Sequence, residues 1–179
     1  MVGAGDAGSQ RPPHVIDPAL LPRNYVAVKL YTGQTLPDTV ETRRILSSLV
    51  ADVSERSPVV LLDTGLAVDQ HTDYEFSAGR VISARRWMTP HNNLGVQTQI
   101  IAGARSFIGT CGGLAWLAPL LGVDTSVLLA DTRNRLHAHL AVATRTYHRA
   151  KAAQFAAVDL RALDDSVFGR HSRESAGAS

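Results

Sequence analysis

Short apolar runs alternate along this chain with segments of helical periodicity. Six runs are typical of strands buried in a sheet: 25–31, 58–63, 81–82, 106–108, 126–130 and 154–160. Apolar residues at helical spacing predict helices over 38–56, 89–104, 114–121 and 132–153. Because strands and helices alternate, we expect right-handed βαβ units. The predicted fold class is α/β, a three-layer α/β/α Rossmann-like domain with a mainly parallel sheet.

Local signals mark the ends of the predicted helices. Asp38 or Thr39 suits the cap of the first helix. Thr89 and Pro90 suit the cap and the first position of the second. Gly122 follows the third helix, where a left-handed residue commonly ends a helix.

The pattern predicts a single Rossmann-like domain over residues 23–160. Residues 1–22 are rich in Gly, Ala and Pro, so we expect a disordered or loosely packed segment. We expect a flexible polar tail over 161–179. The early G-x-G-x-x-G over 3–8 has no strand before it and is followed by two prolines, so it is not a dinucleotide fingerprint.

Composition narrows the classes of partner. A net charge of +2 and 6% aromatic residues do not indicate a nucleic acid partner. The single cysteine, Cys111, excludes an internal disulfide and fits the cytoplasmic location that we expect. No apolar stretch reaches ~18 residues, so we expect no transmembrane segment. The N-terminus has no basic segment followed by an apolar run, and we expect no secretory signal.

Two glycine-bearing loops are expected to meet at one edge of the sheet. In the Rossmann-like strand order 3-2-1-4-5-6, ligands bind where the first and fourth strands end. The first strand leads into residues 32–35, and the fourth leads into Gly109, Thr110, Cys111, Gly112 and Gly113. A strand, a glycine turn and a helix start together leave backbone N–H groups free to bind an anion. These loops therefore predict a phosphate-binding crevice.

Side chains near this crevice offer further contacts. Lys29 could place an ammonium beside a phosphate, and the polar residues Thr32, Gln34, Thr35 and Thr110 could add neutral hydrogen bonds. Other interpretations stay open. The glycines could serve a tight turn alone, and Lys29 could point into solvent. Cys111 could be a small packed residue or, with its pKa lowered at a helix start, a nucleophile.

Four segments resemble the C-terminal half of bacterial GT-B-type glycosyltransferases: YVAVKLY, SPVVLLDTG, MTPHNNLGVQTQIIAGARSFIGTCGGLAWLAPLLG and TSVLLAD. The resemblance covers residues 23–153 and is strongest over 92–122. In that half, a strand-end loop and a glycine turn bind a nucleotide diphosphate sugar. GT-B enzymes have two such domains, and this chain has room for one. The resemblance therefore implies a donor-binding domain that is incomplete as a transferase, with a partner chain or a dimer replacing the N-terminal domain.

The resemblance implies a metal-free site without a cofactor. The turn from Thr110 to Gly113 and Lys29 would hold the diphosphate, and Asp63 and Thr64 would meet the nucleoside. The candidate substrate-binding residues are Lys29, Thr32, Gly33, Gln34, Asp63, Thr64, Gly109, Thr110, Cys111, Gly112 and Gly113. No metal site is expected from His137 and His139, because side chains two residues apart on a helix diverge by about 200°.

The catalytic residues are not identified by the sequence. His71 and His91 are alternative bases or surface residues, and Asn92 and Asn93 are alternative ligand contacts or helix caps. Asp131 could cap a helix or face the crevice. Arg133 and Arg135 could assist phosphate binding or lie on a solvated face.

Two other functions remain open. The chain could be a non-catalytic nucleotide- or protein-binding module, and an apolar face with Trp87 or Trp116 would favour a partner. It could also be a sugar-nucleotide epimerase-like enzyme, with Asp63 and Asp131 as acid and base.

Overall fold

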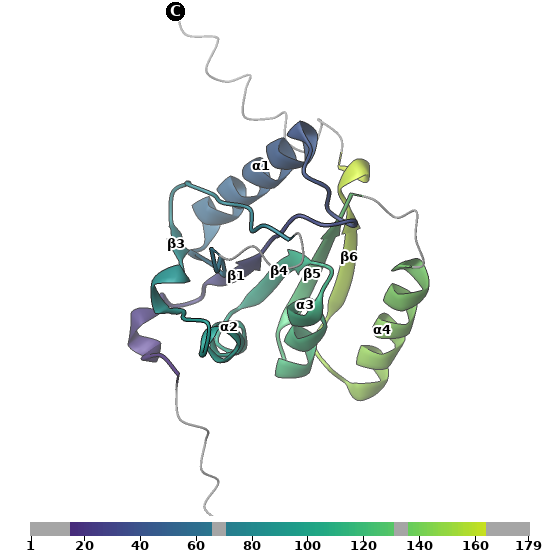
Figure 1. Cartoon of the computed structure of the whole chain (residues 1–179). Helices are drawn as coiled ribbons and strands as arrows, with labels where there is room; N and C mark the ends of the chain where they lie inside the picture. Colours follow the sequence, from purple (N-terminus) through teal and green to yellow (C-terminus); the bar gives the residue numbers. More distant parts are fainter. Residues whose placement is uncertain (1–14, 66–70, 131–135, 164–179) are drawn as a thin grey trace, which may run out of the picture.

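A computed structural model describes residues 15–65, 71–130 and 136–163 of the chain (Figure 1). Six parallel strands form one sheet in the order β3-β2-β1-β4-β5-β6. The strands are β1 (Val26–Lys29), β2 (Val59–Leu61), β3 (Val81–Ser83), β4 (Ser106–Thr110), β5 (Asp124–Leu129) and β6 (Phe155–Asp159). All six predicted strands are present, and the expected strand order is confirmed.

Within the described residues, four α-helices cover the two faces of the sheet: α1 (Val40–Arg56), α2 (Asn93–Ala102), α3 (Gly113–Leu117) and α4 (Leu136–Ala150). Helix α1 lies on one face, where Ile45 and Leu46 pack with Val28 and Val59. The other three helices lie on the opposite face (Figure 1). The fold is therefore the predicted three-layer α/β/α Rossmann-like domain.

The central strands are apolar because both of their faces are covered. Val28 and its neighbour Ala27 belong to the cores on opposite faces of the sheet, and both are almost fully buried. Phe107 on β4 is 1% exposed and fills the core beneath α2 and α3. This burial explains why continuous apolar runs, rather than alternating ones, predict these strands.

Two helix ends agree with the sequence and one does not. Thr39 caps α1 by accepting a hydrogen bond from the backbone N–H of Thr42, and Gly122 has the left-handed φ of 80°. Helix α2 begins at Asn93, three residues after the predicted first position. The prediction was wrong because Thr89 donates through its backbone N–H and hydroxyl to Asn92 Oδ1, which closes a turn before the helix.

Helix α3 is shorter than the predicted segment. It ends at Leu117 and continues as a 3-10 helix, Ala118–Leu121. Pro119 occupies the first turn of that 3-10 helix, where its missing N–H is tolerated. Pro119 therefore marks the change from α3 to the 3-10 helix that precedes β5.

The packed part of the chain begins before residue 23. Ile16 is 8% exposed and belongs to the core. The Gln99 side chain accepts hydrogen bonds from the N–H groups of Val15 and Ile16 and donates to the carbonyl of Ile16. At the other end, a 3-10 helix (Leu160–Ala162) follows β6. The rest of the predicted terminal segments, 1–14 and 164–179, lies outside the described residues.

Candidate functional site

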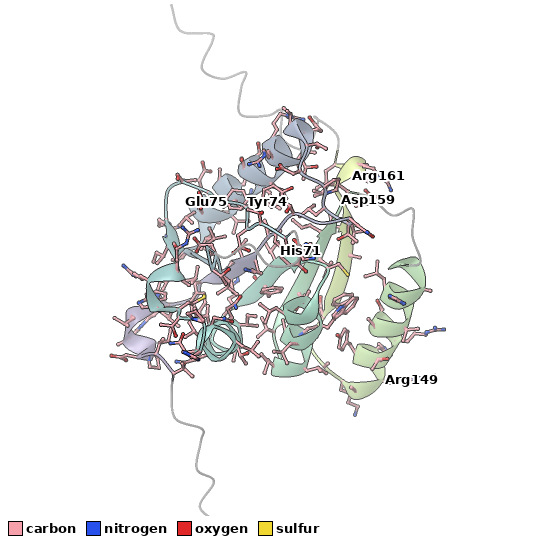
Figure 2. The ribbon with its side chains drawn as sticks, in the orientation of Figure 1. His71, Tyr74, Glu75, Arg149, Asp159 and Arg161 are labelled. Atoms are coloured by element: carbon pink, nitrogen blue, oxygen red, sulfur yellow. The ribbon has the colours of Figure 1, made fainter. Side chains whose placement is uncertain are left out.

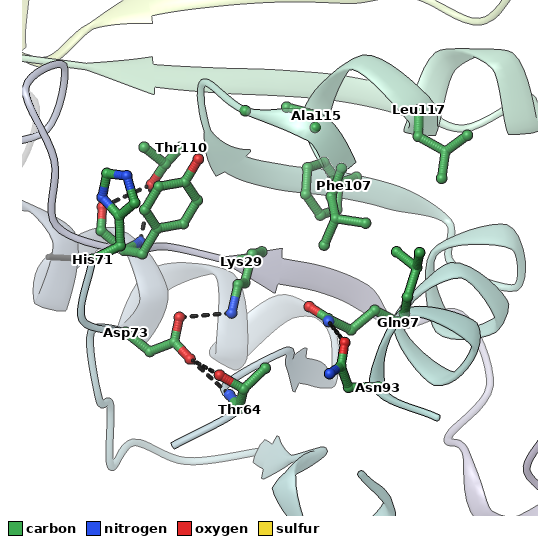
Figure 3. A pocket seen from close by; sticks show the side chains of 15 residues that line it. Lys29, Thr64, His71, Asp73, Asn93, Gln97, Phe107, Thr110, Ala115 and Leu117 are labelled. Atoms are coloured by element: carbon green, nitrogen blue, oxygen red, sulfur yellow. Dashed lines mark hydrogen bonds and ion pairs between the residues drawn. The ribbon is translucent and has the colours of Figure 1, made fainter. Parts of the chain in front are cut away.

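A cleft of about 620 Å³ lies at the carboxyl ends of β1 and β4, where the chain order of the sheet reverses (Figure 3). Its polar side is formed by Lys29, Tyr31, Thr64, His71, Asp73 and Thr110. Its apolar side is formed by Leu94, Phe107, Leu114, Ala115 and Leu117. The cleft is at the predicted switch point and has one polar and one apolar end.

The positive charge in this cleft is paired. The Lys29 ammonium lies 2.6 Å from Asp73 Oδ1 and also donates to the carbonyl of Leu62 at 2.8 Å. The other oxygen of Asp73 accepts hydrogen bonds from the backbone N–H and the hydroxyl of Thr64. The two side chains are only 13% and 8% exposed. Lys29 does not point into solvent, and its charge is offset before any ligand binds.

Asp73 reaches the cleft because its segment lies along the end of β1. Tyr31 and Asp73 form an antiparallel bridge. The N–H of Tyr74 donates to Leu30, and the N–H of Thr32 donates to Thr72. Asp73 stands in a polar segment without periodicity, so the sequence pattern does not single it out. One signal was available, since a lysine in a buried strand requires a nearby acceptor or counter-ion.

Thr110 joins the two strands that form the cleft. Its hydroxyl oxygen accepts from the N–H of Tyr31 at 3.0 Å, and its O–H donates to the carbonyl of the same residue at 3.2 Å. The side chain therefore continues the pairing of β1 and β4 by one residue. Thr110 lines the cleft, but its hydroxyl is used by the protein itself.

The three glycines of the turn differ in what surrounds them. A Cβ on Gly109 would lie 2.6 Å from the Phe107 ring, and one on Gly112 would lie 2.0 Å from the Tyr31 hydroxyl. A Cβ on Gly113 would meet nothing within 4 Å. Close packing explains why positions 109 and 112 are glycine, in agreement with the alternative in which these glycines serve the turn alone. It does not explain Gly113, which lines the cleft.

Backbone N–H groups border the cleft beside these glycines. Gly112 is the N-cap of α3 and provides no capping side chain. The carbonyl of Gly112 accepts the hydrogen bond of the Trp116 N–H, and the preceding N–H groups have no partner within the helix. Those groups belong to Gly113, Leu114 and Ala115, which all line the cleft. This turn can donate several hydrogen bonds to one anion.

Six of the candidate residues do not line the cleft: Thr32, Gly33, Gln34, Asp63, Gly109 and Cys111. Thr32 exchanges hydrogen bonds with Thr72, Gly33 packs against the His71 ring, and Gln34 is exposed.

Asp63, another candidate outside the lining, is bonded to residues beyond the cleft. It accepts from the Ser83 hydroxyl at 2.6 Å, and its other oxygen lies 3.3 Å from Arg85 Nε.

His71 is the candidate base that lines the cleft, and Figure 2 shows it near the tip of β4. Its Nδ1 is 2.6 Å from the carbonyl oxygen of Thr32. Because a carbonyl only accepts, Nδ1 carries the proton and Nε2 of the neutral ring is left as an acceptor. His91 is exposed and does not line the cleft. Asp131, Arg133, Arg135 and the side chain of His137 lie outside the described residues.

Burial raises the pKa of the Cys111 thiol above its ordinary value. The lowering expected at a helix start is therefore outweighed by desolvation. We expect iodoacetamide to alkylate Cys111 more slowly in the native protein than in the urea-unfolded chain at pH 8. Because the thiolate reacts, the native rate should still be rising with pH above the ordinary thiol pKa of about 8.5, where the unfolded rate levels off.

The raised pKa of Cys111 also determines how its titration changes folding stability with pH. A thiol that keeps its proton in the native state stabilises the fold below the unfolded pKa. This contribution is lost as the pH rises through the higher native pKa. A native alkylation rate at pH 8 that equals or exceeds the unfolded rate would contradict the raised pKa of the partly buried Cys111 thiol.

Within the described residues, no three His, Cys, Asp or Glu side chains come together as a metal site. No helix in this part of the chain is both long enough and apolar enough to cross a membrane.

Comparison with protein-family models, curated proteins and solved structures found no match to this chain. The fold is a Rossmann-like α/β domain, and its cleft lies at the switch point of the sheet.

Proposed function

We propose that this chain is a glycosyltransferase-like, nucleotide-sugar-binding domain that holds the donor diphosphate at the Thr110–Gly113 turn. The observation that carries the proposal is the position of the cleft, at the carboxyl ends of β1 and β4. Parallel α/β sheets bind ligands at this point. The N–H groups of Gly113, Leu114 and Ala115 supply the donors that a diphosphate needs.

The diphosphate and the rest of the donor are expected to contact different sides of the cleft, because the charge of Lys29 at the polar end is already paired. The Lys29 ammonium is offset by Asp73, so it contributes a hydrogen-bond donor more than a net charge. The diphosphate therefore binds chiefly to the backbone of the turn. The apolar side of the cleft, with Phe107 and Leu117, accommodates the less polar part of the donor.

The domain acts with a second domain or chain that supplies the acceptor and the base. Leu94 lines the cleft and is 64% exposed, which gives the rim an apolar surface suited to a partner. Trp87 and Trp116, the residues expected at such a surface, are partly buried instead. Trp116 stacks on Phe155 with 5.4 Å between ring centroids, and Trp87 lies under the guanidinium of Arg86.

One observation favours the non-catalytic alternative. The single carboxylate among the described lining residues, Asp73, already accepts hydrogen bonds from Lys29 and Thr64 through its two oxygens. Binding without turnover is therefore the second candidate function. The epimerase-like alternative has less support, because Asp63 is bonded to Ser83 and Arg85 outside the cleft lining.

The test is thermal unfolding with UDP, GDP, ADP, CDP and dTDP. At about 100 times its Kd, a nucleotide that binds the native state should add about 2.7 kcal/mol of stability. Gly113→Glu should weaken this nucleotide about tenfold or more, because it adds a like charge in the open space beside the turn. Gly113→Gln is the uncharged control and should retain more of the stabilisation. A wild-type protein that no nucleotide stabilises would reject the proposal.

A further inference from the structure

The side chain of Gln97 is buried in the wall of the cleft with one unsatisfied polar atom. Gln97 is 5% exposed and lines the cleft. Its amide oxygen, Oε1, has no hydrogen-bond partner among the described residues. Buried polar atoms are nearly always paired, so an unpaired acceptor at the wall of a cleft points to a donor group on the ligand.

Neighbouring bonds fix the orientation of this amide. Asn93 donates through Nδ2 to the carbonyl of Pro90 at 3.3 Å. Its Oδ1 is therefore turned toward Gln97 and accepts from Gln97 Nε2 at 3.5 Å. Since Nε2 faces Asn93, Oε1 is left on the side toward Lys29 (Figure 3).

Lys29 presents a complementary donor across the cleft. Two of the three N–H groups of its ammonium bond to Asp73 and Leu62, which leaves one for a ligand. In Figure 3 the Lys29 ammonium is turned toward Asp73, and the oxygen end of Gln97 lies on the side that faces Lys29. A hydroxyl satisfies both, because it accepts from the ammonium and donates to the amide oxygen. A phosphate oxygen only accepts, so it would face Gln97 Oε1 and Asp73 unfavourably.

We infer that Gln97 and Lys29 bind a hydroxyl of the uncharged sugar moiety of the donor, and so form a sugar subsite separate from the diphosphate turn. This inference rests on the proposed function, since it divides the same cleft into two parts. Phe107, Ala115 and Leu117 form the apolar wall beside the subsite. Such a wall suits the C–H groups of a sugar ring, while Gln97 and Lys29 form hydrogen bonds with its hydroxyl.

Gln97→Met tests the subsite, because methionine fills a similar volume and removes the unpaired acceptor. Nucleoside diphosphates and their hexose conjugates are titrated calorimetrically against wild type and variant. We expect wild type to bind the hexose conjugate more tightly than the nucleoside diphosphate alone. This gain in affinity, the sugar increment, should fall about tenfold in Gln97→Met. The affinity for the nucleoside diphosphate alone should stay unchanged. Gln99→Met is the matched control, since Gln99 holds Val15 and Ile16 instead, and it should leave the sugar increment intact.

A series of deoxy-sugar conjugates, titrated against wild type and Gln97→Met, supplies a second measurement. Removing the hydroxyl that contacts Gln97 should weaken binding about tenfold in wild type, and it should have no further effect in Gln97→Met. If nucleoside diphosphates bind but the sugar increment is absent, survives in Gln97→Met or resists every deoxy change, the subsite is overturned and the proposed function stands. If neither nucleoside diphosphates nor their sugar conjugates bind, the proposed function and the subsite both fail.

Discussion

Replacing Asp73 with asparagine is expected to lower the free energy of unfolding by about 3–5 kcal/mol, because it leaves the buried Lys29 ammonium without its counter-ion. Asparagine has nearly the same shape, so the loss reports the charge rather than a cavity. Urea-induced unfolding of wild type and variant gives the value directly.

Two further variants separate this effect from a general sensitivity to charge. Lys29→Met combined with Asp73→Asn removes both charges and should recover most of the stability, since apolar replacement of a buried pair is often neutral. Asp38→Asn breaks the exposed pair of Asp38 and Arg43, whose side chains are 41% and 59% exposed, and should have a much smaller effect. A loss in Asp73→Asn no larger than that in Asp38→Asn would contradict the role of Asp73.

Replacing Gly112 with valine is expected to destabilise the fold by about 1–3 kcal/mol and to abolish nucleotide binding. Its Cβ would lie 2.0 Å from the Tyr31 hydroxyl, so the tyrosine must move at the polar end of the cleft. The backbone of Gly112 has an extended φ of −174°, so the effect comes from contact and not from backbone strain. Urea unfolding and nucleotide titration measure the two parts separately.

Alanine substitutions give matched controls for this contact. Gly112→Ala should be destabilising, whereas Gly113→Ala should be neutral or stabilising, because its Cβ meets open space at the start of α3. Adding Tyr31→Phe to Gly112→Ala removes the nearest atom and should recover part of the loss, with the ring carbon Cζ still 3.2 Å away. Equal effects of alanine at positions 112 and 113 would show that the Tyr31 contact is unimportant.

The sequence predicts the sheet well because each central strand is buried on two faces. Runs such as Val59–Leu61 contain no polar residue, so they are easily recognised as buried strands. Their alternation with helices restricts the possible strand orders. Local signals do less well at helix starts. Thr89 and Pro90 suit a helix cap, but they equally suit the turn that Asn92 closes.

The candidate site was predicted in position more than in detail. The Gly109–Gly113 turn and Lys29 follow from the topology, and the structure brings Lys29, Thr64, Thr110, Gly112 and Gly113 to one cleft. Asp73 was missed because long-range contacts, rather than any local pattern, bring it to β1. Gln97 had a local signal, since it is a polar residue between the buried Val96 and Ile100 on the inner side of α2.

The most direct test of a switch-point diphosphate site is an amide NMR titration of the wild-type protein with the nucleoside diphosphate that stabilises it most. If the diphosphate binds at the turn, the largest shifts will be those of the N–H groups of Gly113, Leu114 and Ala115, with smaller shifts at Thr110. Saturating nucleotide that leaves these signals in place, or that shifts only the residues around Val81 to Arg86 at the far edge of the sheet, would contradict the account.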